Sequence, residues 1–344
     1  MGEAEKAPKP RLRWYQYRLA SLFVVVALIA ILVAMPSFAS GADSSTEKHE
    51  KLPEGNAGIA AKYPGDKGIN QAPGVLFADD FEQCSSVADL RKKWDVLTNA
   101  ANLGITEDES NKYGGGKSLL MTIPKQDVPL ATGVAKLLTE TQDVLFLRWY
   151  VKFDSGWSVL SGSVHNGGSI SSKYYDRGRA TPGIRADGRN KFLANFENEN
   201  STGNAPGHMN VYVYWPEQGD KWGDHFFPSG KVLPFSHNRS GAATFGKHFN
   251  ARQDFSPQLD RWYCYEYMVK ANMPGKRDGR IALWVDGKLI ADFPNLRLRN
   301  VEDLKIDRFG LGLYIAKNTK RANRKWHDNV VAATSYVGPM VPSK

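Results

Sequence analysis

Short hydrophobic runs separated by turn residues fill the chain from residue 75 onward. β-Branched and aromatic residues are concentrated in these runs, and Gly, Asn, Asp or Pro stands between them, which is typical of strands joined by turns. The predicted strands are Val75–Phe81, Ser118–Ile123, Val144–Phe153, Lys191–Phe196, Met209–Trp215, Trp262–Lys270, Arg280–Val285, Lys288–Ala291, Arg308–Ile315 and Trp326–Ala333. Only Ser86–Lys93 and Val301–Lys305 suggest short helices. Many strands without alternating helices predict an all-β, two-sheet antiparallel jelly-roll sandwich, whose first and last strands usually lie close together.

One strand pair carries a clear turn signal. Asp286-Gly287 separates the run Ile281–Val285 from the run that begins at Lys288. A two-residue Asp-Gly connection between apolar runs predicts a tight β-hairpin, because both turn positions need a positive φ.

The N-terminal residues differ from the rest of the chain. Leu19 to Met35 are apolar except for Ser21, five basic residues precede them, and Ser37-Phe38-Ala39 follows. This is the layout of a secretory signal peptide, and an uncleaved signal anchor would give the same orientation. Residues 40–73 are polar and without hydrophobic periodicity, so they predict a linker or loosely ordered arm. The predicted organisation is a signal peptide or signal anchor over 1–39, the arm over 40–73 and a jelly-roll domain over 74–340.

Charge and cysteine content narrow the range of partners. The 344-residue chain has a net charge of +9, which favours acidic polysaccharide, nucleic acid or an anionic surface. Both interpretations of the N-terminus place the domain outside the cytoplasm, either secreted or membrane-anchored. We therefore expect an acidic polysaccharide or another glycan as partner, no nucleic acid, and membrane contact only through an uncleaved N-terminal segment. Two cysteines exclude a disulfide-rich scaffold and a four-thiolate zinc site.

Several motifs resemble one family. They are Arg261-Trp-Tyr-Cys-Tyr-Glu266, Asn272-Met-Pro-Gly275 with Asp278-Gly279, Leu283-Trp-Val-Asp286-Gly287 and Asp328-Asn-Val-Val331. This set is similar to concanavalin A-like jelly-roll proteins related to polysaccharide lyase family 14, the alginate-lyase-like group. Ala60–Asp66 and Phe77–Glu82 resemble the opening of exported, uncharacterised relatives. The resemblance covers roughly residues 60–340, and it implies a sandwich with one sheet bent into a glycan-binding groove.

The strand Met209–Trp215 supplies the first candidate site residues. Because side chains alternate along a strand, Tyr212 and Tyr214 share a face with Asn210, and the apolar residues between them share the other. We expect the tyrosine face to be wet and to form the groove. In the family that this chain resembles, a Tyr-x-Tyr pair of this kind is catalytic.

Elimination on a uronic acid needs a group that neutralises the carboxylate, a base and an acid. A tyrosine base needs a neighbouring positive charge, since the pKa of free tyrosine is about 10. Arg185 resembles the arginine of the family's preceding strand. The family's lysine-bearing loop is replaced by Ser161–Gly168, so His165 is the candidate base or carboxylate neutraliser, with Lys173 as the nearest alternative lysine.

Other functions remain open at this stage. Glu197 and Glu199 would face one way, about 6.5–7 Å apart by strand rise, which suits a glycosidase pair, but the longer carboxylate motif of jelly-roll glycosidases is absent. A lectin-like module would need only a groove with exposed aromatics such as Trp215 or Trp222, with Lys173, Asn210 and Glu197 as further glycan contacts. A structural envelope protein would have a flat or filled face. The sequence leaves catalysis itself undecided.

Two further expectations concern stabilisation of the domain. Export and an even cysteine count favour a Cys84–Cys264 disulfide. Acidic residues gather near both ends of the domain at Asp79, Asp80, Glu82 and Asp328, where calcium would find oxygen ligands. Apart from that open calcium site, we expect no cofactor and no metal.

Overall fold

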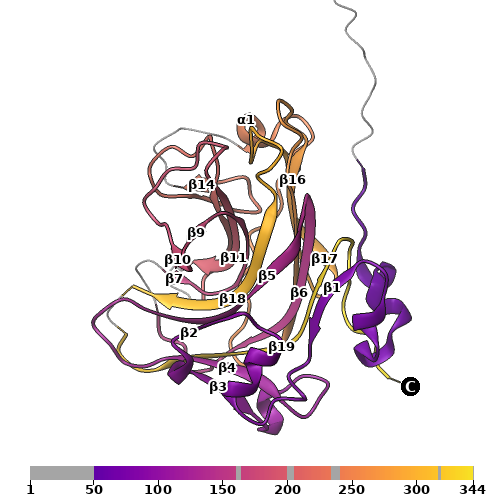
Figure 1. The fold of residues 1–344 in the computed structure, drawn as a ribbon, viewed down its shortest axis with the longest axis vertical. Helices are drawn as coiled ribbons and strands as arrows, with labels where there is room; N and C mark the ends of the chain where they lie inside the picture. Colours follow the sequence, from indigo (N-terminus) through magenta and orange to yellow (C-terminus); the bar gives the residue numbers. More distant parts are fainter. Residues whose placement is uncertain (1–49, 160–163, 200–204, 234–240, 317–318, 344) are drawn as a thin grey trace, which may run out of the picture. The chain divides into compact units, whose positions relative to one another are not determined.

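Two antiparallel sheets stack on one another in the computed structural model, which describes residues 50–159, 164–199, 205–233, 241–316 and 319–343 (Figure 1). Within those ranges, sheet A has eight strands and sheet B nine. Sheet A contains, in order, β17 (Lys288–Leu296), β16 (Gly279–Val285), β15 (Tyr263–Lys270), β6 (Val144–Phe153), β19 (Asn323–Ala333), β4 (Ser118–Ile123) and β3 (Leu103–Thr106), with β1 (Val75–Asp79) also on β19. Sheet B contains β14 (Val232–Leu233), β13 (Asp224–Phe226), β12 (His208–Tyr214), β11 (Phe192–Glu199), β8 (Gly168–Ser172), β18 (Ile306–Ile315), β5 (Leu130–Gln142) and β2 (Val96–Thr98), with β7 (Val164–His165) also on β18. The jelly-roll prediction is confirmed.

Sheet B is curved, and short elements lie on the inside of the curve (Figure 1). These elements are the strands β9 (Tyr175–Asp176) and β10 (Arg179–Ala180), which form a two-stranded ribbon. The concave face of sheet B is therefore partly covered by the chain that connects β8 to β11. This cover decides which residues of the face remain accessible.

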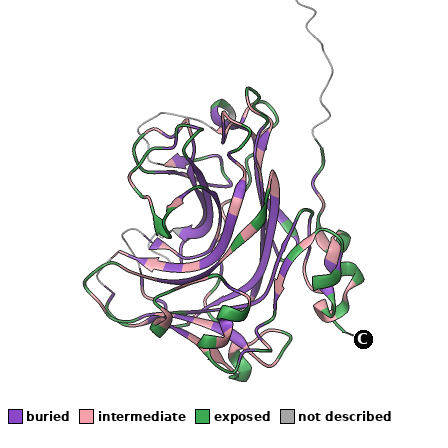
Figure 2. Ribbon diagram, in the orientation of Figure 1, coloured by how far each residue is buried: buried purple, intermediate pink, exposed green. Residues whose placement is uncertain are grey.

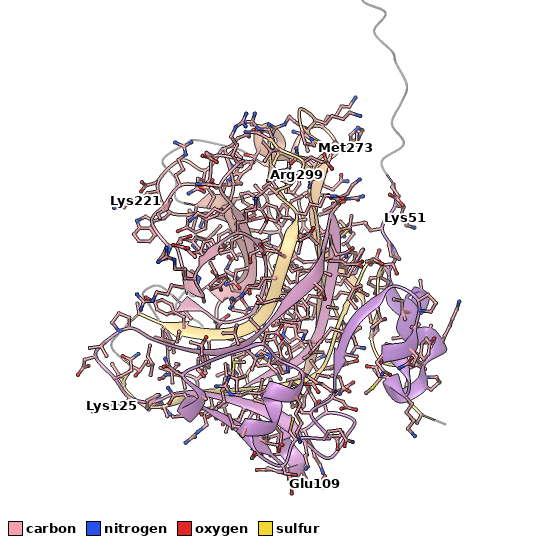
Figure 3. The ribbon with its side chains drawn as sticks, viewed as in Figure 1. Lys51, Glu109, Lys125, Lys221, Met273 and Arg299 are labelled. Carbon is pink, nitrogen blue, oxygen red and sulfur yellow. The ribbon has the colours of Figure 1, made fainter. Side chains whose placement is uncertain are left out.

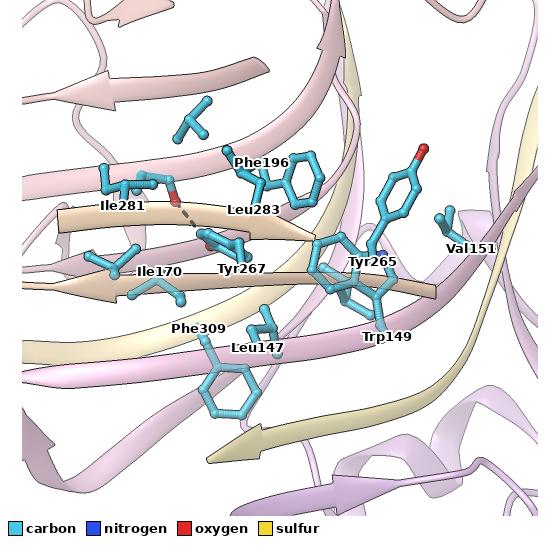
Figure 4. Close-up of a cluster of buried hydrophobic side chains, with 14 of the residues drawn as sticks. Leu147, Trp149, Val151, Ile170, Phe196, Tyr265, Tyr267, Ile281, Leu283 and Phe309 are labelled. Carbon is cyan, nitrogen blue, oxygen red and sulfur yellow. Dashed lines mark hydrogen bonds between the residues drawn. The ribbon is translucent and has the colours of Figure 1, made fainter. Parts of the chain in front are cut away.

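The sandwich core consists of apolar side chains from alternate positions of both sheets (Figure 4). Trp149 of β6 packs edge-on against Phe196 of β11, with ring centroids 5.6 Å apart. The hydroxyl of Tyr267 in β15 donates to the carbonyl of Ala194 in β11 at 3.1 Å, so one hydrogen bond crosses the core. Figure 2 shows burial concentrated in the strands and exposed residues gathered in turns.

Most predicted strands are present with similar bounds. The first and last strands of the sandwich, β1 and β19, pair with one another as expected. The Asp286-Gly287 hairpin is also confirmed: Val285 pairs with Lys288, and the φ angles of the two turn residues are 48° and 76°. The helix expected at Val301–Lys305 is wrong, since those residues form turns, and Ser86–Lys93 contains the 3-10 helix Val87–Lys92.

The sequence did not reveal β5, the longest strand. Its glycine, Gly133, lies opposite Gly312 of β18. A Cβ atom on Gly133 would stand 2.5 Å from the carbonyl oxygen of Leu311. The close approach of the β18 backbone requires glycine at position 133, and this glycine interrupts the hydrophobic pattern on which strand prediction depends.

The described part of the predicted arm, residues 50–73, packs on the domain instead of forming a loose linker. Residues 50–72 form the 3-10 helices Gly55–Ala57, Ile59–Lys62, Pro64–Asp66 and Ile69–Gln71 on the outer face of sheet A. The indole of Trp284 donates to the carbonyl of Pro53 at 2.8 Å, and the amide of Ala60 donates to the carbonyl of Val337 at 2.9 Å. The arm shields the apolar residues on the outer face of sheet A from water. The polar composition of the arm does not predict this packing.

The expected disulfide is wrong, because both cysteines are buried and free. Cys84 belongs to the core between the sheets. Cys264 of β15 lies outside that core. It pairs with Tyr150 of β6, and the charged residues Arg148 and Glu266 lie near its thiol. The two thiols thus lie in different layers of the domain.

The acidic residues considered for calcium are occupied by protein donors. Asp79 accepts from Lys93 and from the indole of Trp94, at 2.9 and 2.8 Å. Glu82 accepts from the amides of Gly116 and Lys117, at 2.7 and 2.9 Å. Asp328 accepts from the amide of Tyr113. Among the described residues, no group of three or more His, Cys, Asp or Glu side chains is placed to hold a metal ion.

The segment predicted as signal peptide or anchor, 1–39, lies outside the described residues. In the part that is described, none of the helices has the length and apolar character needed to span a membrane.

Candidate functional site

The two faces of β12 differ as the alternation predicts. Val211, Val213 and Trp215 belong to the sandwich core, whereas Tyr212 and Tyr214 point to the opposite, concave face of sheet B. The expectation that the tyrosine face is wet is wrong, since Tyr212 is 7% and Tyr214 0% exposed. Trp215, considered for sugar stacking, is likewise fully buried in the core.

The chain that crosses the concave face buries these tyrosines. Tyr174 and Ala186 pack against them, and the amide of Gly183 donates to the Tyr214 hydroxyl at 3.1 Å. On the other side, the amide of Gly223 donates to the Tyr212 hydroxyl, also at 3.1 Å. Tyr212 and Tyr214 therefore have their polar ends satisfied inside the protein.

His165 and Glu197 meet on the concave face next to Tyr212. The Nδ1 atom of His165 lies 2.8 Å from Oε2 of Glu197. The His165 ring stacks on Tyr212 and on Tyr314 of β18, with centroid distances of 4.8 and 5.6 Å. The His165 side chain is 31% exposed and the Glu197 side chain 0%, so a buried carboxylate holds a half-exposed imidazole.

A second imidazole lies on the other side of Tyr212. His225 of β13 is the cross-strand partner of Tyr212, and the two ring centroids are 4.6 Å apart. Its Nδ1 atom lies 2.9 Å from Oδ1 of Asn210 and 3.5 Å from Oε1 of Glu197. We call His165, Glu197, Asn210, Tyr212 and His225 the histidine cluster.

The hydrogen bond to Asn210 fixes the tautomer of His225. The Asn210 amide nitrogen donates to the carbonyl of His208, so its Oδ1 faces His225 and can only accept. The proton of neutral His225 therefore resides on Nδ1, which leaves Nε2 as a proton acceptor.

The protein shifts the pKa values of the two imidazoles in opposite directions. Burial, with a smaller effect of the charge on His165, lowers the pKa of His225 to about 3. Burial also opposes the charged form of His165, but the charge and hydrogen bond of Glu197 outweigh it and raise the pKa of His165. The surroundings thus stabilise the neutral form of one imidazole and the protonated form of the other.

Glu197 is itself surrounded by polar groups. Burial raises its pKa, and the charge of His165 and a hydrogen bond from Asn195 work against that rise. The ammonium group of Lys325 approaches from the core side and donates to the carbonyl of Asn166, next to His165. Lys325 is fully buried, and burial lowers its pKa well below the ordinary value, while the charge of Glu197 opposes that shift.

Three predicted site residues lie apart from the cluster. Arg185 is exposed in the loop before β11 and donates to the carbonyl of Pro216 at 3.4 Å. The strand expected there does not form, because Gly183 and Gly188 have φ angles of 73° and 82°. Lys173 pairs with Asp303 at 3.1 Å on the surface.

Trp222 lies at the edge of the covering chain. It is 45% exposed, and the ammonium of Lys221, labelled in Figure 3, stands 5.5 Å from its ring. The Trp222 ring covers Gly183, where an added Cβ would approach it to 3.2 Å.

Of the predicted site residues, four come together on the concave face: His165, Glu197, Asn210 and Tyr212. Tyr214 lies next to them, whereas Arg185, Lys173 and Trp222 lie apart. The Glu199 side chain, half of the glycosidase pair, lies outside the described residues.

Sequence reasoning missed three residues of the site, His225, Tyr314 and Lys191. His225 is an isolated histidine on a strand of three residues, so only the register of β13 against β12 reveals it. The ammonium of Lys191 lies 4.7 Å from the Tyr214 ring and 4.8 Å from the Tyr174 ring. Burial lowers the pKa of Lys191 to about 8.

The stacked sheets, the paired end strands and the curved face define a concanavalin A-like jelly roll of the kind found in alginate lyases. The solved structure of alginate lyase Aly36B is similar over 78% of this chain and 99% of its own, at 15% identity and a TM-score of 0.54. A mutant of Aly36B in complex with alginate tetrasaccharide gives 16% identity over the same shares and the same TM-score. The PL-14 alginate lyase from Aplysia kurodai gives 12% identity and a TM-score of 0.52, over 76% of this chain and 99% of its own. No protein-family model and no curated protein matches the sequence, so the similarity establishes the fold.

Proposed function

We propose that this protein binds an acidic polysaccharide on the concave face of sheet B and cleaves it by β-elimination. The observation that supports this most is the pair of partly buried imidazoles on either side of Tyr212, both of which lie next to the buried carboxylate of Glu197. Two titratable groups whose environments separate their pKa values are the arrangement that acid–base catalysis requires. The fold shared with alginate lyases is consistent with this role.

The proposed roles follow from the protonation states. His225, neutral with Nε2 as acceptor, removes the proton from C5 of a uronic acid, and the negative carboxylate of the bound sugar raises the pKa of this imidazole so that it can hold the proton. The electron pair forms the C4–C5 double bond, and the bond from C4 to the glycosidic oxygen breaks. His165, kept protonated by Glu197, donates its proton to the departing oxygen, and its positive charge attracts the sugar carboxylate. Atoms and electrons balance without a metal or cofactor.

Tyr212 has a different role in this proposal from the one that the sequence predicts. Burial raises its pKa, and no cation of the described residues stands within hydrogen-bond reach of its hydroxyl. It therefore retains its proton and acts as the spacer that holds the two imidazoles apart. Arg185 has no part in the reaction.

The test is the ultraviolet absorbance of the unsaturated product when the protein is incubated with alginate, polyglucuronate and polygalacturonate. We expect one of these polymers to be cleaved, and both His225→Ala and His165→Ala to lower kcat by about 100-fold or more, in the range for loss of an acid or a base. His248→Ala, an exposed histidine outside the cluster, is the matched control and should keep full activity. Absence of cleavage on every polymer would refute the lyase proposal.

A non-catalytic glycan-binding role is the second candidate. The burial of both Tyr212 and Tyr214 favours it, since the tyrosine pair that is catalytic in the resembling family is not accessible in this chain. Binding of a polyuronate without any unsaturated product would support this candidate. For either function, the signal-like N-terminus supports a location outside the cytoplasm.

A further inference from the structure

A pocket lies apart from the histidine cluster, and none of its lining residues belongs to that cluster. Its volume is about 750 Å³, within the range of binding sites for small molecules and cofactors. Arg252–Ser256, Arg261, Tyr263, Val285–Asp286 and Lys288–Ile290 line it. The walls thus come from β15, β16, β17 and the segment before β15.

The pocket combines an apolar floor with a basic rim. Tyr263, Val285, Leu289 and Ile290 are buried and form the floor. Arg252, Arg261 and Lys288 are exposed at the rim, with their charged ends available to a ligand. A sugar ring has an apolar face and polar edges, so a floor and rim of these kinds complement a carboxylated sugar.

The acidic groups of the pocket do not cancel this positive rim. Asp254 accepts from the amide and the hydroxyl of Ser229, both at 2.9 Å. Asp286 accepts from the amide of Cys264 at 2.8 Å and lies 3.7 Å from Arg261. Arg252 and Lys288 make no ion pair with any carboxylate of the described ranges. The two acids are held by their own neighbours, and two of the three cations have no acidic partner.

A line of polar contacts leads from the histidine cluster to this pocket. Asn210 bonds to His225 on one side and to the carbonyl of His208 on the other. The Nδ1 atom of His208 lies 2.7 Å from the hydroxyl of Ser256, which is part of the pocket wall. Tyr212 and His208 are four residues apart on β12, about 13 Å by strand rise.

We infer that this pocket is a distal binding site for the carboxylated saccharide chain, in which Arg252 and Lys288 bind sugar carboxylates several residues away from the histidine cluster. The inference rests on the proposed function for the class of polymer, but it does not depend on catalysis. Its consequence is a preference for long chains, because a polymer that occupies the pocket and the cluster together gains affinity from both.

The experiment measures binding and cleavage of long-chain alginate by the full chain carrying Arg252→Gln and Lys288→Gln. We expect the dissociation constant for long-chain alginate to rise about tenfold, through loss of two charge-assisted contacts. The kcat should be unchanged, since neither residue belongs to the cluster. A variant with Lys125→Gln and Lys276→Gln removes the same charge at exposed positions outside the pocket and should bind as the wild type does.

Each outcome separates this inference from the proposed function. Binding that depends on Arg252 and Lys288 without any cleavage supports the distal site and refutes the lyase. Cleavage with unchanged binding in the pocket variant refutes the distal site alone. An equal loss of binding in the control variant shows a net-charge effect and also overturns the inference, as does a wild type that binds no polyuronate. Thermal denaturation confirms that both variants are folded.

Discussion

The chemistry of the histidine cluster depends on a few side chains whose charges are set by their neighbours. Glu197 is the centre of that arrangement, since it contacts His165 at one oxygen and lies near His225 with the other. A buried carboxylate stabilises an adjacent imidazolium strongly, because the surrounding protein screens the charges less than water does. The protonation state of His165 is therefore a property of the pair.

The first prediction concerns the pH dependence of the reaction. Glu197→Gln removes the negative charge that raises the pKa of His165, so His165 should lose its proton at a lower pH. Activity that needs protonated His165 falls as the pH rises through its pKa, and this alkaline limb should move to lower pH in the variant. The kcat/KM profile against pH measures the shift, and an NMR titration of the His165 ring provides a readout that is independent of turnover. An unmoved alkaline limb and an unmoved ring titration would both contradict the role given to Glu197.

A second prediction uses Lys191 and concerns stability. In the folded chain its pKa is lowered to about 8 from the ordinary 10.5, so between those pH values the unfolded chain binds more protons. The free energy of unfolding then increases with pH in that interval. Urea denaturation should show the wild type gaining stability relative to Lys191→Met between pH 8 and pH 10.5. Lys62→Met, at an exposed position, should show no such difference in slope.

At the scale of the elements, the cluster depends on a break in sheet B. The strands β7 and β8 both pair with β18, and Asn166 and Gly167 separate them. At this break the Asn166 side chain exchanges two hydrogen bonds with the backbone of Asn198, at 2.9 and 3.0 Å. The break thereby fixes His165 next to β11 and Glu197.

Gly167 tests the importance of that break. A Cβ atom there would stand 1.6 Å from the carbonyl oxygen of Phe196, so Gly167→Ala must push β11 away. We expect a loss of about 1–3 kcal/mol in the free energy of unfolding, typical of overpacking, together with a lower kcat. Gly312→Ala is the control, because the nearest atom to its added Cβ would be 3.8 Å away. Equal stability and activity of the two variants would show that the break does not position His165.

The same elements explain what could be predicted from the sequence. The faces of Tyr212 and Tyr214 follow from a period of two, which is a local property of the strand. Their burial by the chain around Tyr174 and Ala186 depends on contacts distant in sequence, as does the meeting of His165 with Glu197. Local pattern therefore predicted most strands and one face of the site, but not its cover or its chemistry.

At the scale of the whole described domain, contacts on both faces stabilise sheet A: the sandwich core packs on its inner face, and other segments pack on its outer face. The arm and the C-terminal residues cover its outer face, and the amides of Val337 and Gly338 both donate to Glu266. Arg148 of β6 is completely buried under this cover and pairs with Asp66 of the arm. The Asp66 charge raises the pKa of Arg148, against the opposing effect of burial, so the guanidinium stays charged.

Removing the Asp66 charge should therefore destabilise the domain as a whole. Asp66→Asn leaves a buried guanidinium without its counter-charge, and we expect a loss of about 3–5 kcal/mol in the free energy of unfolding. Chemical denaturation measures this loss. Asp303→Asn, whose partner Lys173 is exposed, is the matched control and should leave the unfolding midpoint nearly unchanged. A midpoint for Asp66→Asn as high as that of the control would show that the arm does not stabilise the sheet.

The position of β19 has a consequence for biosynthesis. This strand lies between β6 and β4 and also pairs with β1, so sheet A lacks a central member until residue 333 has left the ribosome. Contacts between residues so distant in sequence form late and slowly. Sheet A is therefore completed only near the end of translation, and until then the edges of β6 and β4 that pair with β19 are exposed, which favours aggregation of the nascent chain.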